Sequence, residues 1–348
     1  MARPDLTIMG AGIFGLSIAW AATQRGAKVR VIEAQAIGAG SSGGPVGALS
    51  PHVPEAWNAK KSFQLDSLLM AEGWWAAVSQ SAGLPTGYGR TGRLQPLADA
   101  RAVAMAKARE AEAQTLWRGL ASWQVVAATG GKWQPQSPSG FMVQDTLTAR
   151  LNPKQALAAL AAAITSQGGQ IILGDAESIG PTLWATGAAG LADLSAALAH
   201  PVGCGVKGQA LLLRYDARTQ PQLFVGGLHI VPHADGTVAI GSTSEPRWTD
   251  AQSTDEQLDA LHHKAIVACP DLADAPVVAR WAGLRPRARS RAPMLGAWPG
   301  RPGHFIANGG FKIGFGMAPK VADVMVDLVL DNRDNIPPDF QLATSLKA

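Results

Sequence analysis

Cysteine is scarce in this sequence, and the two cysteines form no disulfide or metal-binding motif. Cys204 and Cys269 stand alone among 348 residues, and neither lies in a Cys-x-x-Cys motif. We therefore expect no disulfide framework and a reducing compartment. His229 and His233 are four residues apart with no third histidine or carboxylate beside them, so no metal site is expected.

Charge and long apolar runs are also in short supply. Charged residues make up 16% of the chain, and 30 basic against 26 acidic residues leave a net charge of only +4 without a dense basic run. This composition argues against a nucleic-acid partner and against a disordered chain. No apolar run approaches a membrane span, and the first expected strand begins too early to leave room for a signal peptide. With 47% hydrophobic residues the chain can bury a large core, and we expect a cytoplasmic protein with more than one domain.

The first 33 residues alternate between strand, loop, helix and strand. Residues 6–9 predict a short buried strand, residues 14–25 predict a helix that ends at Gly26, and residues 28–33 predict a second strand rich in β-branched side chains. This order is a βαβ unit, whose two strands are expected to be parallel neighbours.

The loop at residues 10–15 (GAGIFG) has the spacing of a dinucleotide-binding turn. Gly10 permits the tight turn, Gly12 lets a pyrophosphate approach the backbone, and Gly15 lets the helix pack closely. The N-terminus of the helix offers free N–H groups to the phosphates. Glu33 follows Gly10 by 23 residues and ends the second strand, where it could bind ribose hydroxyls. Its carboxylate argues against NADP.

The rest of the chain divides into two patterns. Helices are predicted over residues 59–79, 98–120 and 152–168, and strands over 92–97, 170–173 and 182–185. The last two strands suit positions parallel to the first unit. From residue 205 to 245 strand follows strand, which predicts an antiparallel sheet in a second domain. A last helix is predicted to start near Pro319, so the chain leaves the nucleotide domain and returns to it.

Two further segments favour FAD over NAD. Residues 184–187 (WATG) follow a strand and resemble a segment of two-domain flavoproteins. Residues 308–316 (NGGFKIGFG) form a second glycine-rich loop that leads into a helix. A single NAD site does not need this loop. A flavin does, because backbone N–H groups at a helix N-terminus can stabilise negative charge on the reduced ring.

Together these segments resemble the D-amino-acid oxidase family of FAD-dependent oxidoreductases, and within it the glycine oxidases. Residues 38–52 resemble the family's small-residue loop beside the flavin, residues 206–209 its turn into the substrate sheet, and residues 230–243 its central hairpin. Residues 281–286 (WAGLRP) are the most specific match. In the family, the arginine of that motif binds the substrate carboxylate over the flavin.

The resemblance implies an α/β and α+β fold, with a Rossmann-like FAD-binding domain interleaved with a substrate-binding domain on an antiparallel or mixed sheet. The FAD-binding domain is expected over residues 1–60, 150–204 and 281–348, and the substrate-binding domain over 61–149 and 205–280.

The resemblance also implies which residues contact FAD. Members with covalent flavin carry a cysteine near the Arg-Pro motif, and residues 285–300 contain none, so the FAD should be noncovalent. The implied contact residues are Gly10, Gly12, Ile13, Phe14, Gly15, Glu33, Ser41, Ser42, Val46, Gly47, Ala48, Thr186, Gly187, Gly310, Phe311, Lys312, Ile313, Gly314, Phe315 and Gly316.

Four residues are expected at the substrate. Arg285 suits a carboxylate because its planar guanidinium can donate two parallel hydrogen bonds. The others depart from the glycine oxidases: His229 stands where a tyrosine is usual, Lys312 where there is an arginine, and Ser244 where there is a methionine. These departures leave the scaffold and cofactor intact and put the substrate in question.

The predicted reaction is the oxidation of a small amino acid or amine of the glycine, sarcosine or D-amino-acid type. Its carboxylate binds Arg285, a hydride passes from the α carbon to flavin N5, and an imine forms. Molecular oxygen or another acceptor then reoxidises the flavin, with hydrogen peroxide as the product when oxygen reacts. The alternatives are a dehydrogenase of the same fold that serves a quinone or carrier protein, an NAD-dependent enzyme, and a non-catalytic flavin-binding protein. A homo-oligomer is compatible with the sequence.

Overall fold

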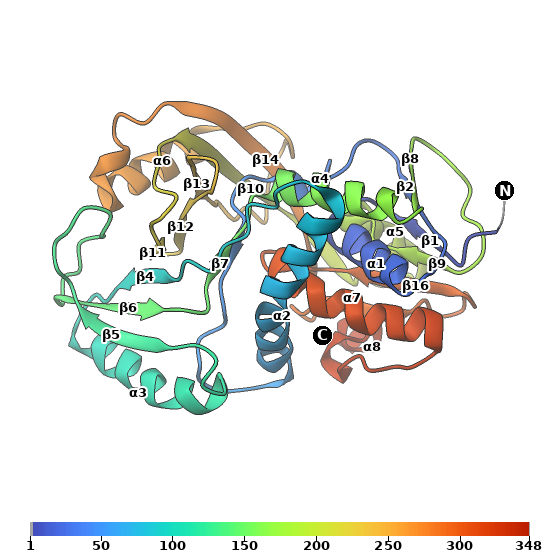
Figure 1. The fold of residues 1–348 in the computed structure, drawn as a ribbon, viewed down its shortest axis with the longest axis horizontal. Coiled ribbons are helices and arrows are strands. Elements are labelled where there is room, and N and C mark those ends of the chain that lie inside the picture. Colours follow the sequence, from blue (N-terminus) through green and yellow to red (C-terminus); the bar gives the residue numbers. More distant parts are fainter. Residues whose placement is uncertain (1–2, 348) are drawn as a thin grey trace.

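The structure is a computed structural model that describes residues 3–347 as two sheet-based lobes with helices between them (Figure 1). The strands are β1 Leu6–Met9, β2 Val29–Glu33, β3 Ala48–Leu49, β4 Arg93–Pro96, β5 Trp123–Ala127, β6 Phe141–Asp145, β7 Ala149–Arg150, β8 Gln170–Leu173, β9 Thr182–Trp184, β10 Gly203–Arg214, β11 Gln222–Val225, β12 Leu228–Pro232, β13 Thr237–Gly241, β14 Val277–Ala288, β15 Met294–Ala297 and β16 His304–Asn308. The helices are α1 Ile13–Gln24, α2 Ala59–Ala82, α3 Ala100–Leu116, α4 Pro153–Ser166, α5 Gly187–Ala197, α6 Glu256–Ala268, α7 Gly314–Asp331 and α8 Leu342–Lys347.

The first lobe contains a six-stranded sheet in the order β15-β16-β9-β1-β2-β8. Every neighbouring pair from β16 to β8 is parallel, and only β15 runs antiparallel to its neighbour. Leu6 and Ile8 on β1 are fully buried, as expected for a central parallel strand. The predicted parallel pairing of the first two strands is confirmed, as are the positions of the strands at 170–173 and 182–185 beside them.

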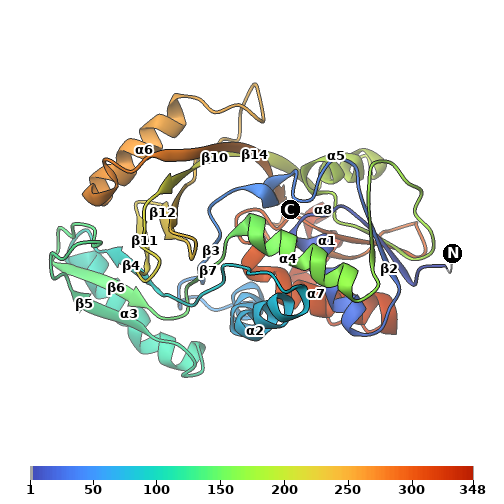
Figure 2. The ribbon, with the colours of Figure 1, turned by 45° about the horizontal axis from the view of Figure 1, so that its top comes forward.

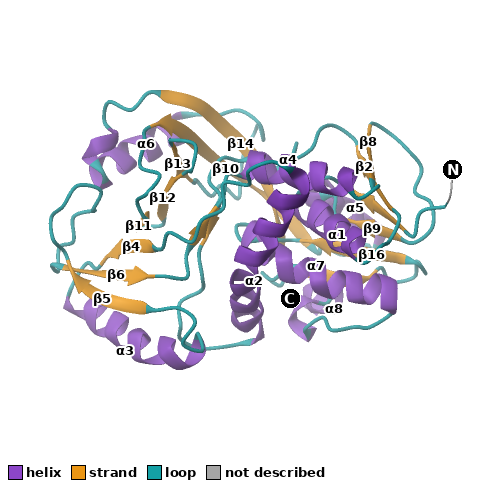
Figure 3. Cartoon of the chain, in the orientation of Figure 1, coloured by secondary structure: helices purple, strands orange, loops and turns teal. Residues whose placement is uncertain are grey.

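The second lobe contains an eight-stranded mixed sheet in the order β14-β10-β13-β12-β11-β4-β6-β5. Its pairs are antiparallel except for β11 and β4, which are parallel. Helix α3 packs along β5 and α6 along β10 (Figure 3). The antiparallel sheet predicted over residues 205–245 is confirmed as the part from β10 to β13.

Two long strands connect the lobes. Strands β10 and β14 run from beside α6 in the second lobe to beside α5 in the first (Figure 2). Helix α2 packs on α7 and α4 of the first lobe. No helix within residues 3–347 is long and apolar enough to cross a membrane.

Two expectations from the sequence need correction. The last helix begins at Gly314 and not near Pro319, which lies inside α7. No strand was predicted over residues 277–288, which contain Gly283 and Pro286. Strand β14 forms there through pairing with β10, and its position at the edge of the sheet tolerates the proline. Residues 281–288 belong to the sheet of the second lobe, and α2 packs on helices of the first.

Candidate cofactor and substrate site

The loop between β1 and α1 has the backbone geometry that a dinucleotide requires. Gly10 has a φ of +105°, in the region that favours glycine. A Cβ on Gly15 would overlap the carbonyl oxygen of Gly10, so close packing of helix against loop depends on this glycine. Gly12 gives α1 no side-chain cap, and Ser42 Oγ accepts a hydrogen bond from Ile13 N–H at 3.0 Å. The N-terminus of α1 therefore keeps donors for an anion.

The carboxyl ends of neighbouring strands meet at this loop. Glu33 at the end of β2 accepts a hydrogen bond from Ala11 N–H at 2.8 Å. A Cβ on Gly10 would lie 2.6 Å from Ala185 O, at the end of β9, so the segment that contains Thr186 touches the first loop. Asn308 at the end of β16 donates to Gly187 O at 2.9 Å. In proteins with a parallel sheet, ligands bind outside the carboxyl ends of the strands.

The second glycine-rich loop packs directly on the first. A Cβ on Gly310 would lie 2.8 Å from the ring of Phe14, and a Cβ on Gly314 would lie 3.4 Å from Ile13. Helix α7 begins at Gly314 without a side-chain cap from Ile313. The N-termini of α1 and α7, neither of which is capped by the side chain of its own N-cap residue, thus converge within a cradle in which added Cβ atoms would clash. These features fit FAD, and they support the predicted roles of residues 310–316.

The small-residue loop at 38–52 lies between the two sheets. A Cβ on Gly44 would lie 3.2 Å from the Trp281 ring, and one on Gly241 would overlap Val46. His233 Nε2 lies 3.3 Å from Val46 O. This loop, which also carries Ser41 and Ala48, therefore contacts β13 and β14 of the second lobe while Ser42 caps α1 in the first. The sequence predicted its position beside the flavin, and its contacts fit that prediction.

Arg285 on β14 is 7% exposed and forms no ion pair within 4.0 Å among the described residues. Its Nη1 donates to Thr243 O at 3.2 Å, and its guanidinium carbon lies 5.9 Å from the Trp281 ring centroid. A Cβ on Gly208 would overlap the guanidinium, so this glycine makes room for it. Burial lowers the pKa of Arg285 to about 10, and the charge of Glu245 opposes that shift. An arginine held in this way is suited to bind a carboxylate.

A buried polar network that the sequence did not reveal lies next to Arg285. Gln209 donates to Glu245 at 3.1 Å and to Asp255 at 2.7 Å. Lys207 Nζ lies 3.7 Å from Glu245 and 3.6 Å from Asp255. Thr243, whose carbonyl oxygen accepts from Arg285, donates through its hydroxyl to Glu245. Gln209 and Lys207 lie on β10, whereas Glu245 follows β13 and Asp255 caps α6, so no local sequence signal could identify their contacts.

His229 on β12 is neutral at physiological pH. Its pKa is lowered to about 3, first by burial and then by the positive charges of Arg93 and Lys312. Its ring centroid lies 4.6 Å from that of Phe224, and its Nδ1 is buried without a hydrogen-bond partner. Arg93 is itself neutralised by Asp145, with Nε and Oδ2 2.9 Å apart.

Lys312 lies in the second glycine-rich loop and is exposed. Phe311 N–H donates to Pro286 O at 2.9 Å, which holds this loop beside the strand that carries Arg285. The pKa of Lys312 is lowered, first by desolvation and then by the charge of Arg285. Ser244 is exposed, next to the Thr243 carbonyl that Arg285 contacts. The loop that carries Lys312 is thus held beside Arg285, the charge of Lys312 acts on His229, and Ser244 lies next to a residue that contacts Arg285.

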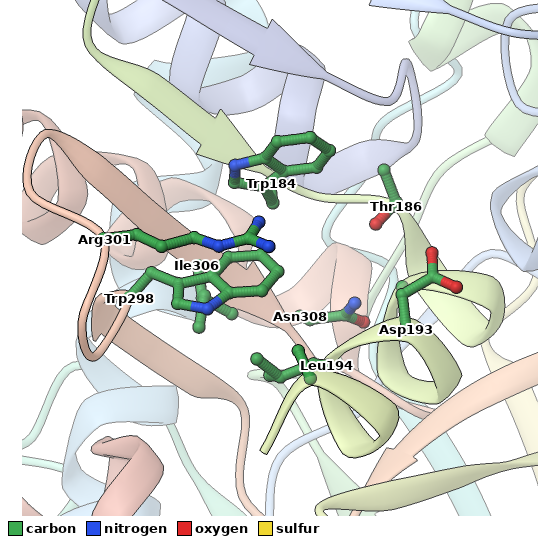
Figure 4. A pocket seen from close by; sticks show the side chains of 10 residues that line it. Trp184, Thr186, Asp193, Leu194, Trp298, Arg301, Ile306 and Asn308 are labelled. Carbon is green, nitrogen blue, oxygen red and sulfur yellow. The ribbon is translucent and has the colours of Figure 1, made fainter. Parts of the chain in front are cut away.

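A separate pocket lies on the first lobe between α5, β9 and β16 (Figure 4). Its empty volume is about 490 Å³, and its lining includes Trp184, Trp298, Asp193 and Arg301. Trp184 Nε1 donates to His304 Nδ1 at 3.0 Å. The lining does not include Arg285, His229 or Lys312, so the pocket is distinct from the candidate substrate site.

Comparisons with known proteins agree with this arrangement. A glycine oxidase of Pseudomonas aeruginosa is 35% identical over 134 residues, which are 38% of this chain and only 37% of that protein. A glycine oxidase of Geobacillus kaustophilus is 26% identical over 361 residues, covering 94% of this chain and 93% of that protein. The crystal structure of glycine oxidase from Geobacillus kaustophilus superposes with a TM-score of 0.83 at 22% identity, over 98% of this chain and 99% of that chain.

These similarities confirm the fold class and the cofactor that the sequence predicts. Residues 5–328 match the family DAO, described as FAD dependent oxidoreductase. The match spans both glycine-rich loops and the strand that carries Arg285. The chain therefore belongs to the DAO family of FAD-dependent oxidoreductases.

Proposed function

We propose that this protein is an oxidase of small amino acids or amines that carry a carboxylate, of the glycine, sarcosine or D-amino-acid type. Arg285 supports this proposal more than any other observation, because a buried arginine without an acidic partner within 4.0 Å offers its charge to a ligand. The similarity to glycine oxidases supports the same class of substrate.

In this proposal the protein binds, orients and desolvates the substrate. The substrate carboxylate lies on Arg285, whose guanidinium is positioned by Thr243 and Trp281. His229 stays neutral and can accept or donate a hydrogen bond without adding charge. The amine binds as the free base, and no side chain acts as a general base. Bound FAD would supply the redox chemistry: it would take up the two electrons and the hydrogen lost when the substrate's C–N bond is oxidised to an imine, and pass the electrons on to oxygen, which is reduced to hydrogen peroxide.

Anaerobic bleaching of the flavin tests the proposal. The purified protein is mixed with glycine, sarcosine, D-alanine, D-proline and larger D-amino acids, and the loss of flavin absorbance is followed. We expect at least one of them to bleach the flavin within seconds. If none of these amines, nor their N-methyl derivatives, changes the spectrum, the protein is a non-catalytic flavin-binding protein instead.

The electron acceptor needs a measurement of its own. We expect one hydrogen peroxide per substrate oxidised in air, because the proposal assigns oxygen as the acceptor. A protein that is bleached by substrate but yields little peroxide, and turns over rapidly with a quinone or an artificial dye, is a dehydrogenase of the same fold.

A further inference from the structure

The pocket on the first lobe takes no part in the proposed reaction. It lies between α5, β9 and β16, and its empty volume of about 490 Å³ is in the range of small-molecule sites. On α5 the lining residues follow helical spacing, so one face of this helix forms a wall of the pocket. These residues are Gly190, Asp193, Leu194 and Ala197. Glycine and alanine at the two ends of that face leave the space open.

The pocket and the cofactor loop lie on different sides of the segment that follows β9. The side chains of Trp184 and Thr186 line the pocket (Figure 4). Ala185, between them, does not line it, as expected where successive side chains of an extended segment alternate. The carbonyl oxygen of Ala185 would lie 2.6 Å from a Cβ on Gly10. This segment therefore separates a ligand in the pocket from a dinucleotide at the first loop.

Two indole rings and an arginine form one side of the pocket. The ring centroids of Trp184 and Trp298 are 5.7 Å apart, and Trp184 is held by the hydrogen bond from its Nε1 to His304 at 3.0 Å. The guanidinium carbon of Arg301 lies 4.5 Å from the Trp298 ring centroid, a stacking contact that orients the guanidinium and leaves its N–H groups free. Within residues 3–347, no carboxylate lies within 4.0 Å of Arg301.

Polar groups lie across the pocket from Arg301. Figure 4 shows Asp193 and Thr186 on that opposite side. Asp193 forms no ion pair within 4.0 Å among the residues that the structure describes. Thr186 is the N-cap residue of α5, but its hydroxyl accepts no capping hydrogen bond. A Cβ on Gly190 would overlap that hydroxyl, so the glycine makes room for it. The pocket thus offers a cation on one side, an anion and a hydroxyl on the other, and aromatic surface along its wall.

We propose that this pocket binds a free aromatic amino acid as its zwitterion. The carboxylate of the ligand pairs with Arg301, its ammonium group with Asp193 and the Thr186 hydroxyl, and its ring packs against the two indoles. Each charge of the ligand meets an opposite charge, whereas a ligand that lacks one of its charges leaves Arg301 or Asp193 without a partner. The inference does not rest on the proposed function, because Arg285 does not line the pocket.

Calorimetry on the FAD-loaded protein tests the site. L-tryptophan is titrated into the wild type and into Arg285→Met, which removes the expected carboxylate ligand of the substrate site and leaves the pocket intact. We expect one molecule to bind per chain in both proteins, with a Kd of about 1 mM or lower. Tryptamine lacks the carboxylate, indole-3-propionate lacks the ammonium group, and L-alanine lacks the ring. We expect each of these three to bind at least about tenfold more weakly.

Substitutions of the two charged residues test their contacts. Asp193 and Arg301 are exposed, so Asp193→Asn and Arg301→Gln should fold normally. We expect each variant to bind L-tryptophan at least about tenfold more weakly than the wild type. Arg280→Gln is the matched control, because Arg280 lies on β14 in the other lobe and pairs with Asp259 at 2.8 Å. Its affinity for L-tryptophan should equal that of the wild type.

A pair of substitutions on α5 tests the position of the ligand. Ala197 lines the pocket and is exposed, so Ala197→Phe should fold and place its ring in the space that the ligand needs. Ala196 is also exposed and does not line the pocket, which makes Ala196→Phe the control. We expect binding to be lost in the first variant and kept in the second.

Three results would overturn the proposal. One is the absence of L-tryptophan binding to the wild type. Another is binding that disappears in Arg285→Met, which would place the ligand in the substrate site. The third is tryptamine or indole-3-propionate binding as tightly as L-tryptophan, which would remove one of the two charge contacts.

Discussion

The position of Arg285 depends on the absence of a side chain at Gly208. A Cβ at residue 208 would overlap the guanidinium, which is the mobile end of its side chain. We therefore expect Gly208→Ala to fold and bind FAD but to displace Arg285, raising KM for a carboxylate substrate by about tenfold or more. Steady-state kinetics and the flavin spectrum measure both effects.

The neighbouring glycine on the same strand provides the control for this change. In Gly205→Ala the new Cβ would lie 3.2 Å from Leu284 Cδ1, which a small side-chain shift relieves. Its KM should stay near that of the wild type. Equal KM values in Gly208→Ala and the wild type would mean that Arg285 does not bind the carboxylate.

His229 should make the fold sensitive to acid. Its pKa in the folded protein is about 3 against 6.5 for an unperturbed histidine, so between these values the unfolded chain binds a proton that the folded chain does not. Stability therefore falls as the pH falls below 6.5, by up to about 1.4 kcal/mol per pH unit for this one group. In His229→Gln, the loss of unfolding free energy between pH 7.5 and pH 5, measured with urea, should be smaller by about 1–2 kcal/mol.

Two other histidines will keep the His229→Gln variant partly sensitive to acid. Burial also lowers the pKa of His52 and of His233, so their share of the stability loss at low pH is the same in the variant and the wild type. His263→Gln, on the exposed face of α6, is the matched control. The same acid-induced loss in His229→Gln and the wild type would contradict the neutral, buried state of His229.

At the level of these residues, the sequence offered candidate ligands but not the residues that support them. Arg285 was predictable from its place in a six-residue motif that resembles a family motif. Thr243, Glu245 and Lys207 were not, because they reach Arg285 only through pairing of β10 with β14 and through the loop after β13. The contacts of Arg285 with Thr243 and of Lys207 with Glu245 join residues about 40 positions apart, where local patterns carry no information.

At the level of elements, the first glycine loop should separate cofactor binding from folding. A Cβ at Gly12 would meet only Ser42 Oγ, at 3.3 Å, so Gly12→Ala should fold normally. The same methyl would occupy the surface on which a pyrophosphate approaches the backbone, and we expect FAD affinity to fall at least about tenfold. Flavin content after gel filtration and circular dichroism measure the two properties.

A glycine with free space around it is the control for that variant. Gly73 lies within α2 with nothing near its missing Cβ, so Gly73→Ala should keep its FAD and gain about 0.5–1 kcal/mol of stability. Full flavin content in Gly12→Ala would show that the pyrophosphate does not bind at this loop.

Local signals explain why some elements were predictable and others were not. The βαβ unit is marked by glycines and β-branched residues within 33 positions, and α4 begins at Pro153 after the cap residue Asn152. Strand β14 contains Gly283 and Pro286 and becomes a strand only because β10 pairs with it along its length. Helix α7 starts before Pro319, because the glycine loop and not the proline sets its beginning.

At the level of the whole molecule, chain order and spatial order diverge. Helix α1, at the start of the chain, packs on α7 near its end, and Arg25, directly after α1, lies 2.6 Å from Asp327 of α7. The return of the chain to the first lobe was predictable from the second glycine loop. The points at which the chain passes from one lobe to the other could not be predicted, because they depend on which strand of each sheet lies at an edge.

Because the two glycine loops are about 300 residues apart in sequence and meet at one site, FAD should stabilise the whole first lobe. A ligand at 100 times its Kd adds about 2.7 kcal/mol to the unfolding free energy. For a chain of this length, that corresponds to a rise in Tm of about 4 °C. We expect Tm of the apoprotein to increase with the logarithm of FAD concentration in a thermal shift assay. NAD should have no effect, and Gly12→Ala should shift the FAD curve to higher concentration. A Tm that rises with NAD and not with FAD would contradict the flavin assignment, since a ligand that binds the folded state raises Tm in proportion to its binding free energy.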